Sequence, residues 1–534
     1  MSQQDPNRVE NTPLVFLDRA ARAFAGRAAI QFGERARTYG EFAADAQTMA
    51  RALATVVTPG QAVATLSPNA PELLTAHYSV PLARAALVTV NTRLAADEVA
   101  YILEHSQAPL LFADSSLAAT ALQAAAACDH EVRVVVWGGE APDGAEPYDT
   151  FLAGGNGTPD LPWEVSDEDA VIAINYTSGT TGRPKGVEYT HRGAYLNSLG
   201  VLHHAGFDAD TRYLWTLPMF HCNGWCTPWA VTAAGGLHLI ISAVRTDLVM
   251  SAIHDDGVTH LCGAPTVMDT IVTGAGATPF PQRIRMIVGG APPSPSLLAH
   301  IEELGATVTH AYGMTEAYGP FTICEYQPEW DDLEPLERAW RMSRQGVAML
   351  QSGGVRVVDE QMRDVPDDGT TIGEIVMRGN NVMRGYHRDP EATAKAFTGG
   401  WLHSGDLGVM HPDGYIELKD RTKDIIISGG ENISSIEVEN ALLAYPDIED
   451  AAVVGVADRR WGERPWAYVV AKGDLDQAAL IEHLRRHIAG YKVPDAIQVL
   501  ESLPRTSTGK LLKRDLRLRA AEEASRTAPG IGAA

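Results

Sequence analysis

Eleven consecutive residues, Tyr176-Thr-Ser-Gly-Thr-Thr-Gly-Arg-Pro-Lys-Gly186, combine hydroxyl groups, three glycines and one lysine directly after an apolar segment. Glycines let backbone N–H groups approach an oxyanion, hydroxyls donate hydrogen bonds or help to hold a metal, and the lysine adds a positive charge. The sequence therefore predicts a phosphate-binding loop. The spacing is not that of a Walker A motif. On spacing alone, a flexible surface loop stays open as the alternative.

Short apolar runs must position this loop. Ala170–Asn175 and Met286–Val288 end in glycines or hydroxyl residues and alternate with helical patterns, as parallel strands of α/β proteins do. Helices are predicted after Thr12-Pro13, after the capping box Thr38-x-x-Glu41, and in the alanine-rich region 118–127. Because ligands bind at the ends of such strands, we expect the functional site there.

The composition excludes several classes of protein. The chain has 534 residues, 45% of them hydrophobic, and a net charge of −24, which argues against nucleic acid or an anionic membrane as the main partner. Its five cysteines are never spaced C-x-x-C, so neither a disulfide framework nor a structural zinc site is expected. No signal peptide and no membrane-spanning segment are recognised. These features favour a cytoplasmic enzyme.

A domain boundary is predicted at the polar segment Asp420-Arg-Thr-Lys423, which leaves about 110 residues after it. From Asp424 onward there are 14 Lys plus Arg against 17 Asp plus Glu, a net charge of −3, and the preceding part carries −21. The contrast is consistent with two separately folding units.

The loop YTSGTTGRPKG resembles the signature of the adenylate-forming superfamily of acyl-CoA synthetases, luciferases and peptide-synthetase adenylation domains. Further motifs that resemble this family follow in the expected order: Gly289-Gly-Ala-Pro-Pro293, Tyr312-Gly-Met-Thr-Glu316, Gly373-Glu-Ile-Val-Met-Arg-Gly379, Ser404-Gly-Asp406, Asp420-Arg-Thr-Lys-Asp424, Gly429-Gly-Glu-Asn432 and Pro504-Arg-Thr-Ser-Thr-Gly-Lys510. Several ordered motifs are far more specific than one glycine loop.

The resemblance implies an α/β fold with two domains. A large N-terminal domain, residues 1–422, would contain α/β subdomains with mixed sheets. A small α+β domain, residues 423–534, would rotate about a hinge at Lys423 between two half-reactions. One orientation would present Lys510 to the nucleotide, and the other would present Gly429-Gly430, which would help to form the tunnel for a pantetheine thiol.

The resemblance also implies the chemistry. A carboxylate attacks the α-phosphate of ATP, pyrophosphate leaves, and the thiol of CoA then displaces AMP. Thr177 and Glu316 match the Mg²⁺ positions, and an oxygen set of this kind suits that ion. Lys510, His221 and Glu316 would be catalytic. The implied nucleotide-binding residues are Thr177, Ser178, Gly179, Thr180, Thr181, Gly182, Lys185, Gly290, Ala291, Pro292, His310, Ala311, Tyr312, Gly313, Thr315, Asp406, Arg421 and Lys423.

The segment Met219–Trp229 resembles the acid-binding region of fatty acyl-CoA synthetases and of plant acyl-activating enzymes. The substrate-binding residues that this implies are His221, Cys222, Trp225, Gly290 and Ala311. Trp225 would either swing away from a long chain or form the pocket floor for a short one. For the thiols of Cys222 and Cys226, a place in the pocket is a better prediction than a metal site.

Ile427 and Asn432 depart from the Lys and Trp of long-chain members, and these segments show no basic residue for a second carboxylate. The sequence therefore favours a short- or medium-chain fatty acid, and an aromatic acid is the alternative. A ligase that loads a separate carrier protein also stays open, as does the choice between monomer and homodimer. Lys510, Glu316 and the intact loop argue against a nucleotide-binding regulator.

Overall fold

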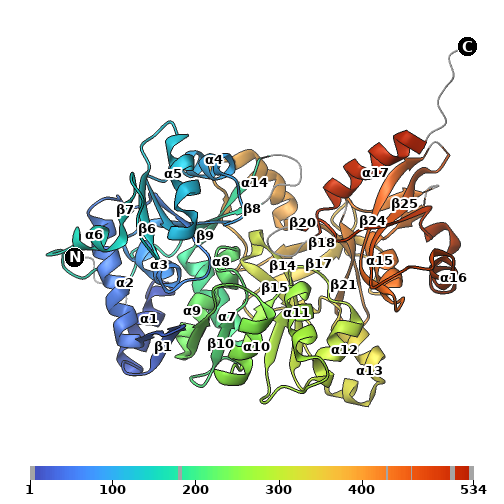
Figure 1. Cartoon of the computed structure of the whole chain (residues 1–534), viewed down its shortest axis with the longest axis horizontal. Helices are drawn as coiled ribbons and strands as arrows, with labels where there is room; N and C mark the ends of the chain where they lie inside the picture. Colours follow the sequence, from blue (N-terminus) through green and yellow to red (C-terminus); the bar gives the residue numbers. More distant parts are fainter. Residues whose placement is uncertain are drawn as a thin grey trace, which may run out of the picture.

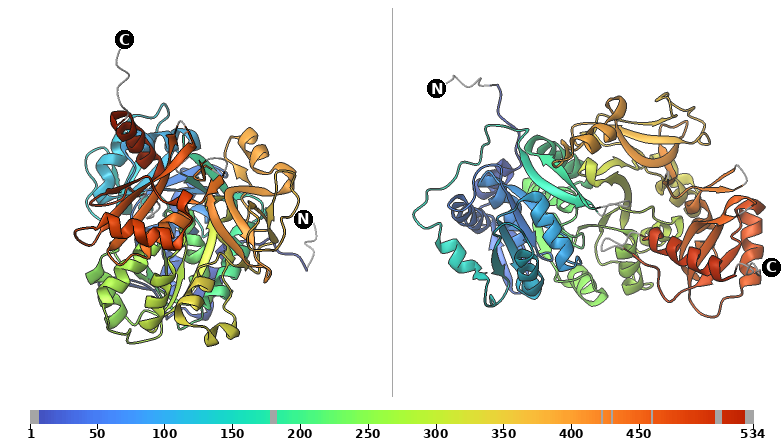
Figure 2. Two further views of the ribbon diagram at one scale, coloured as in Figure 1. Left: turned by 90° about the vertical axis from the view of Figure 1, so that its right-hand side faces the viewer. Right: turned by 90° about the horizontal axis from the view of Figure 1, so that it is seen from above.

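The structure is a computed structural model that describes residues 7–177, 183–421, 423–428, 431–458, 460–505 and 511–527, of which 432 and 524–527 by their backbone alone. Over these residues the chain forms four sheets with flanking helices. Two large mixed sheets and a smaller antiparallel one precede Arg421, and the fourth sheet follows it. Figure 1 shows this last unit, in orange to red, at one end of an elongated molecule, and the view from above in Figure 2 agrees. The mixed α/β fold with a large N-terminal part and a small C-terminal part confirms the predicted fold class.

The sheet that leads to the phosphate loop runs in the order β19-β9-β8-β4-β3-β5-β6-β7. It is parallel from β8 to β7 and antiparallel at β8-β9 and β9-β19. Its strands are β3 (Ala62–Leu66), β4 (Ala86–Val90), β5 (Leu110–Asp114), β6 (Arg133–Trp137), β7 (Glu146–Pro147), β8 (Val171–Thr177), β9 (Lys185–Thr190) and β19 (Gly385–Tyr386). The helices between them are α3 (Pro71–Leu82), α4 (Ala96–Ser106), α5 (Ala118–Ala126) and α6 (Tyr148–Ala153).

The second large sheet runs in the order β16-β15-β14-β13-β12-β10-β11-β1-β2 and is parallel from β14 to β1. Its strands are β1 (Ala28–Phe32), β2 (Arg35–Thr38), β10 (Arg212–Trp215), β11 (Leu237–Ile240), β12 (His260–Gly263), β13 (Arg285–Val288), β14 (Thr307–Met314), β15 (Gly319–Ile323) and β16 (Val347–Ala348). Its helices are α1 (Leu14–Ala23), α2 (Tyr39–Ala54), α7 (His191–Ala205), α8 (Cys222–Trp225), α9 (Thr227–Ala234), α10 (Thr246–Asp255), α11 (Pro265–Ala275), α12 (Pro295–Glu303) and α13 (Pro335–Met342).

Local signals in the sequence explain several of these elements. The Thr38 side chain accepts from the Glu41 backbone and the Glu41 carboxylate accepts from Thr38, so the predicted capping box starts α2. The helix predicted after Pro13 and the alanine-rich helix are also present as α1 and α5. In α3 every residue but Glu72 is buried, as expected for a helix that lies inside the protein rather than at its surface.

The two smaller sheets lie on either side of the predicted boundary. The first is antiparallel, with the strands β17 (Gly354–Val358), β18 (Gly373–Arg378), β20 (Leu402–Met410) and β21 (Ile416–Arg421), and α14 (Pro390–Ala396) precedes β20. The second contains β22 (Ile426–Ser428), β23 (Glu431–Ile433), β24 (Ile448–Asp458), β25 (Gly462–Ala471) and β26 (Ala496–Val499), with α15 (Ser435–Leu443), α16 (Gln477–His487) and α17 (Lys513–Thr527). Its own buried apolar cluster is centred on α15, β24 and α16.

Among the described residues, no helix combines the length and the apolar character that crossing a membrane requires.

Candidate active site

Glu316 lies in a single turn directly after β14, at the carboxyl end of that strand. Its side chain is buried, and the hydroxyl of Tyr386 on β19 donates to its Oε1 at 2.8 Å. Burial raises the pKa of this carboxyl, while the Tyr386 hydrogen bond and the nearby Lys185 lower it. A buried carboxylate of this kind is stabilised by a cation. Thr177 is the last residue of β8. Its hydroxyl and the Glu316 carboxylate are oxygen ligands of the kind that suits Mg²⁺.

Lys185 begins β9, directly beside the phosphate loop. Its ammonium lies 4.6 Å from the ring centroid of Tyr386, a cation–π contact. Tyr386 thus contacts two residues that the sequence assigned to the site, one through its hydroxyl and one through its ring. Sequence reasoning missed Tyr386, although it closes the sequence Met-Arg-Gly-Tyr shortly after the Gly373–Gly379 motif.

Asp406 on β20 joins two further predicted residues. It accepts a hydrogen bond of 2.7 Å from the Tyr312 hydroxyl, and Arg421 Nε lies 3.4 Å from its other oxygen. Burial raises the pKa of Asp406, and Arg421 opposes that shift. The carboxylate is thus fixed in place between two partners, with an orientation that could bind the two hydroxyls of a ribose. Lys423 follows Arg421 after one residue outside the described part of the chain.

The residues after β13 and in β14 form the wall between these carboxylates. Gly290 has φ +85° and is exposed, with open space where a Cβ would lie, so its backbone is accessible to a ligand. Ala291 and Pro292 follow it, and Gly313 packs so closely on Gly319 that a Cβ would lie 1.9 Å from the Gly319 carbonyl oxygen.

His310, by contrast, is not brought together with the other predicted side chains. Its Nδ1 lies 2.8 Å from the Ser343 carbonyl oxygen and 3.0 Å from that of Arg344, and burial lowers its pKa to about 4. Its side chain therefore holds the 343–344 backbone, and only its backbone in β14 belongs to the wall.

Residues 222–226, between β10 and α9, form a left-handed turn. Five consecutive φ angles lie between +47° and +62°, although only Gly224 is a glycine. Such a conformation costs about 1–2 kcal/mol per non-glycine residue, so the surrounding contacts must hold it. Asn175 on β8 does so, because its amide donates to Asn223 Oδ1 at 2.6 Å and its Oδ1 accepts from the Asn223 N–H at 3.2 Å.

The turn presents His221 and Cys222 to the site. Burial lowers the pKa of His221 to about 4, so its imidazole is neutral near pH 7 and can donate or accept a hydrogen bond. The Cys222 thiol contacts the Thr315 hydroxyl at 3.3 Å, and burial raises its pKa to about 12. A thiol that keeps its proton is a poor metal ligand. The described residues contain no cluster of three or more His, Cys, Asp or Glu side chains that could hold a metal ion.

Trp225 is the fourth residue of this turn and lines the apolar cavity described below. Its indole is held between two glycines: a Cβ at Gly289 would lie 3.1 Å from its Cη2, and a Cβ at Gly319 would lie 2.6 Å from its Cδ1. The same Gly289 Cβ would lie 2.7 Å from the carbonyl oxygen of Ala311, so indole, glycine and β14 are in close contact. In this structure the Trp225 indole therefore occupies the space between Gly289, Gly319 and β14. Its two predicted roles, a floor for a short acid and a gate that swings away from a long one, stay predictions.

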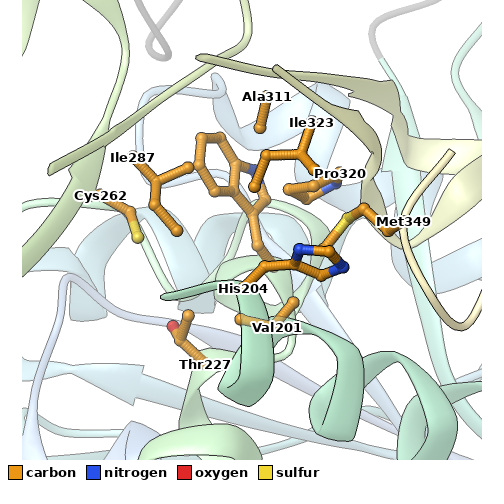
Figure 3. Close-up of a pocket in the computed structure, with 10 residues that line it drawn as sticks. Val201, His204, Thr227, Cys262, Ile287, Ala311, Pro320, Ile323 and Met349 are labelled. Atoms are coloured by element: carbon orange, nitrogen blue, oxygen red, sulfur yellow. The ribbon is translucent and has the colours of Figure 1, made fainter. Parts of the chain in front are cut away.

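Next to the indole lies an apolar cavity of about 10 Å³, room for about one water molecule. Figure 3 shows it between α7 and the strands β12 to β15. The residues around it are Val201, His204, Trp225, Thr227, Cys262, Ile287, Ala311, Pro320, Ile323 and Met349. Sequence reasoning found only Trp225 and Ala311 of this set, because the others, most of them ordinary apolar residues, come from six separate segments.

We refer to the two parts of the site as the polar half and the apolar half. The polar half consists of Lys185, Tyr312, Glu316, Tyr386, Asp406 and Arg421, and the apolar half consists of the cavity residues together with Gly289 and Gly319. Six further predicted residues, Ser178, Gly179, Thr180, Thr181, Gly182 and Lys510, lie outside the described part of the chain, as do Gly429 and Gly430.

Comparisons with known proteins agree with this arrangement. Residues 17–387 match the family model described as AMP-binding enzyme, and residues 437–510 match the model described as AMP-binding enzyme C-terminal domain. The structure superposes on the o-succinylbenzoate CoA synthetase of Bacillus subtilis in complex with its acyl-adenylate, with a TM-score of 0.81, 27% identity, and coverage of 96% of this chain and 99% of the other.

Three curated relatives are CoA ligases. Acetate–CoA ligase CCL3 of Humulus lupulus is 43% identical over 96% of this chain and 95% of its own length. Acetate/butyrate–CoA ligase AAE7 of Arabidopsis thaliana is 42% identical over the same shares, and the benzoate–CoA ligase of that plant is 38% identical over 96% and 94%.

These relatives also correct one expectation. AAE7 and the benzoate–CoA ligase are peroxisomal by name, so the expected cytoplasmic location is wrong. Net charge and cysteine content did not identify the compartment, because neither quantity is specific to one of them. The matched models cover most of the chain, and the ordered motifs, the fold and the relatives agree. The chain belongs to the AMP-binding enzymes and, among them, to the acid–CoA ligases.

Proposed function

We propose that this enzyme activates a short- or medium-chain carboxylic acid with ATP and transfers the acyl group to CoA, with release of AMP and pyrophosphate. The observation that carries the proposal is the position of a small apolar cavity, closed by Trp225, beside a polar half that contains two buried carboxylates. Because the cavity has room for about one water molecule, side chains around it must move even for a short acid, and a long chain would have to displace the whole indole. The names of the acetate and acetate/butyrate ligases support the same substrate class.

In this proposal the polar half binds MgATP. Asp406, with Tyr312 and Arg421, would hold the ribose, and the backbone around Gly290 would lie along the nucleotide. Thr177 and Glu316 would hold Mg²⁺, which neutralises charge on the phosphates. Lys185 would leave the Tyr386 ring for the phosphates.

The apolar half would direct the acid toward the α-phosphate. A carboxylate placed near His221 meets a neutral imidazole, which does not retain it as an ion pair. The methyl end of the acid would face the cavity. An aromatic acid, the alternative that the benzoate–CoA ligase supports, would require the Trp225 indole to move.

We further propose that the boundary lies between residues 422 and 423 and that the small domain rotates about Lys423. Lys510 would act in adenylate formation only. Lys510→Ala should therefore lower adenylate formation about 100- to 1,000-fold and spare acyl transfer from a supplied adenylate to CoA. Equal loss in both half-reactions would contradict this assignment.

The test of the proposed function is AMP and acyl-CoA formation from ATP, Mg²⁺ and CoA with linear acids from acetate to dodecanoate, 2-methylpropanoate, benzoate and cinnamate. We expect both products, with the highest kcat/KM for an acid no longer than hexanoate. Because a single methylene changes selectivity by about 1–3 kcal/mol, the series should resolve neighbouring acids. A maximum at benzoate or dodecanoate would overturn the substrate class. Pyrophosphate release without acyl-CoA would instead indicate a carrier-protein acceptor.

A further inference from the structure

His204, on the last turn of α7, contacts both the apolar cavity and two residues that are exposed to solvent. Its side chain is only 5% exposed and lines the cavity. The two residues that it contacts on the other side are open to water: Leu350 is 71% exposed and the Glu325 side chain is 47% exposed. The imidazole ring thus borders the cavity and is bonded through its two nitrogens to residues that are open to water. Figure 3 shows the ring beside Met349 and Val201, away from Cys262 and Ile287.

The hydrogen bonds of His204 hold the ring in this place. Its Nδ1 lies 2.9 Å from Glu325 Oε1, and its Nε2 lies 3.1 Å from the Leu350 backbone nitrogen. The Leu350 N–H can only donate, so Nε2 is the acceptor and Nδ1–H donates to the carboxylate. Both nitrogens are then occupied, and the ring presents carbon atoms to the cavity. The pocket is correspondingly apolar at this end.

From this geometry we propose that His204 closes the solvent end of the acid pocket and is a second determinant of acid length, behind Trp225. This inference rests on the proposed function, because it concerns the same acid pocket. Trp225 sets the first limit, since its indole occupies the space next to Ala311. Once the indole is removed, an acid can extend only as far as the His204 ring.

The same wall determines which chain ends are accepted. A carboxylate or hydroxyl at the far end of the acid would meet Val201, Met349 and the carbon edge of an imidazole whose nitrogens are already bonded. A buried polar group without a partner is costly. The pocket therefore selects acids that end in an apolar group, branched or unbranched, and rejects dicarboxylic acids.

The test compares the wild type with Trp225→Ala, His204→Ala and the double variant, by kcat/KM for acids from acetate to dodecanoate. In Trp225→Ala, the highest kcat/KM should shift to an acid that is longer by a few carbons. For still longer acids, kcat/KM should fall steeply. The double variant should continue to gain about fourfold for each further methylene that it buries, up to decanoate. His204→Ala alone should keep the wild-type maximum, because the indole still blocks the passage.

Two controls distinguish the proposed role of the His204 ring, as the end wall of the acid pocket, from other roles of this residue. The neighbouring His203 is exposed, so Trp225→Ala/His203→Ala should behave like Trp225→Ala. His204→Leu keeps an apolar wall without the hydrogen bonds, so with Trp225→Ala it should retain the steep decline. Thermal unfolding of each variant reports correct folding, and His204→Ser replaces any His204→Ala variant that does not fold.

Equal decanoate activity in Trp225→Ala and in the double variant would overturn the proposal. Calorimetric binding of decanoate to the same proteins gives a readout without turnover. If the wild type forms no acyl-CoA from any acid, the proposed function fails, whereas tighter decanoate binding by the double variant alone would still support the wall.

Discussion

The polar and apolar halves of the site are built in different ways. In the polar half, each carboxylate is fixed by one or two directed bonds: Tyr386 to Glu316, and Tyr312 with Arg421 to Asp406. In the apolar half, the Trp225 indole is fixed by the absence of side chains at Gly289 and Gly319. A directed bond needs a particular residue type, whereas a shape can be filled by many combinations. Binding of the common nucleotide and selection of the acid are thus separable within one site.

Among the variants that test whether the two halves act separately, Glu316→Gln should have the largest effect on activity. Loss of the charge at a buried metal position should lower adenylate formation about 100- to 1,000-fold. The ranking of acids should stay the same, because the apolar half is unchanged. Pyrophosphate release with acetate, butyrate and hexanoate over a range of Mg²⁺ measures both. The exposed Glu329→Gln serves as the control. A changed ranking of acids would show that the halves are coupled.

Asp406→Asn should have the next largest effect. Hydrogen bonds to a charged group are worth about 1.5–3 kcal/mol, so the KM for ATP should rise about 10- to 100-fold. The KM for the acid should change little. Titration with a fluorescent ATP analogue checks nucleotide binding without turnover, and the exposed Asp368→Asn is the matched control. An unchanged affinity for the analogue would remove Asp406 from the nucleotide site.

Tyr386→Phe tests how the polar half holds Glu316. The change removes the hydroxyl that donates to Glu316 but keeps the ring under Lys185. We expect about a tenfold higher Mg²⁺ concentration for half-maximal ATP binding. Tyr386→Leu also removes the ring, which Lys185 would leave when it binds the phosphates, so it should not weaken ATP binding beyond Tyr386→Phe. If the two variants are indistinguishable from the wild type in Mg²⁺ dependence, Tyr386 only supports packing.

The smallest effect is expected from Gly319→Ala, which sharpens the description of the apolar half. Gly319 and Gly305 both have positive φ, +95° and +86°, so alanine should cost each about 1–2 kcal/mol of stability. Only at Gly319 would the new Cβ meet the indole, at 2.6 Å, whereas at Gly305 there is open space. The butyrate-to-acetate ratio of kcat/KM should change severalfold in Gly319→Ala and stay constant in Gly305→Ala. Thermal unfolding of both variants completes the measurement, and an equal ratio would show that the indole tolerates displacement.

The polar half was largely predictable from sequence. Thr177, Glu316, Asp406 and Arg421 lie in motifs whose residue types the chemistry requires, and the structure places their side chains around one region. The proposed roles of these residues still await the tests above. His310 illustrates the limit: its place in a motif did not reveal that its imidazole bonds to the 343–344 backbone.

Among the cavity residues of the apolar half, only Trp225 and Ala311 were predicted from sequence. Gly319, Met349 and His204 belong to β15, to the segment after β16 and to α7, and no spacing in the sequence relates them. They come together only through packing. Gly319, for example, shapes the apolar half because the Trp225 indole, from another segment, lies against it. The conformation of residues 222–226 was also not predictable, since three of the five, Cys222, Trp225 and Cys226, are of types that seldom adopt positive φ.

The sequence by itself determined the family, the α/β class and the chemistry of the polar half, because ordered motifs of hydroxyl, carboxylate and lysine residues leave few alternatives. The tertiary structure alone decided the size and the closure of the acid pocket. The floor and the end wall that we propose for it are single side chains, Trp225 and His204, whose positions depend on neighbours distant in sequence. Directed bonds can be anticipated from residue types, whereas the volume left between packed elements is defined only once those elements have been placed.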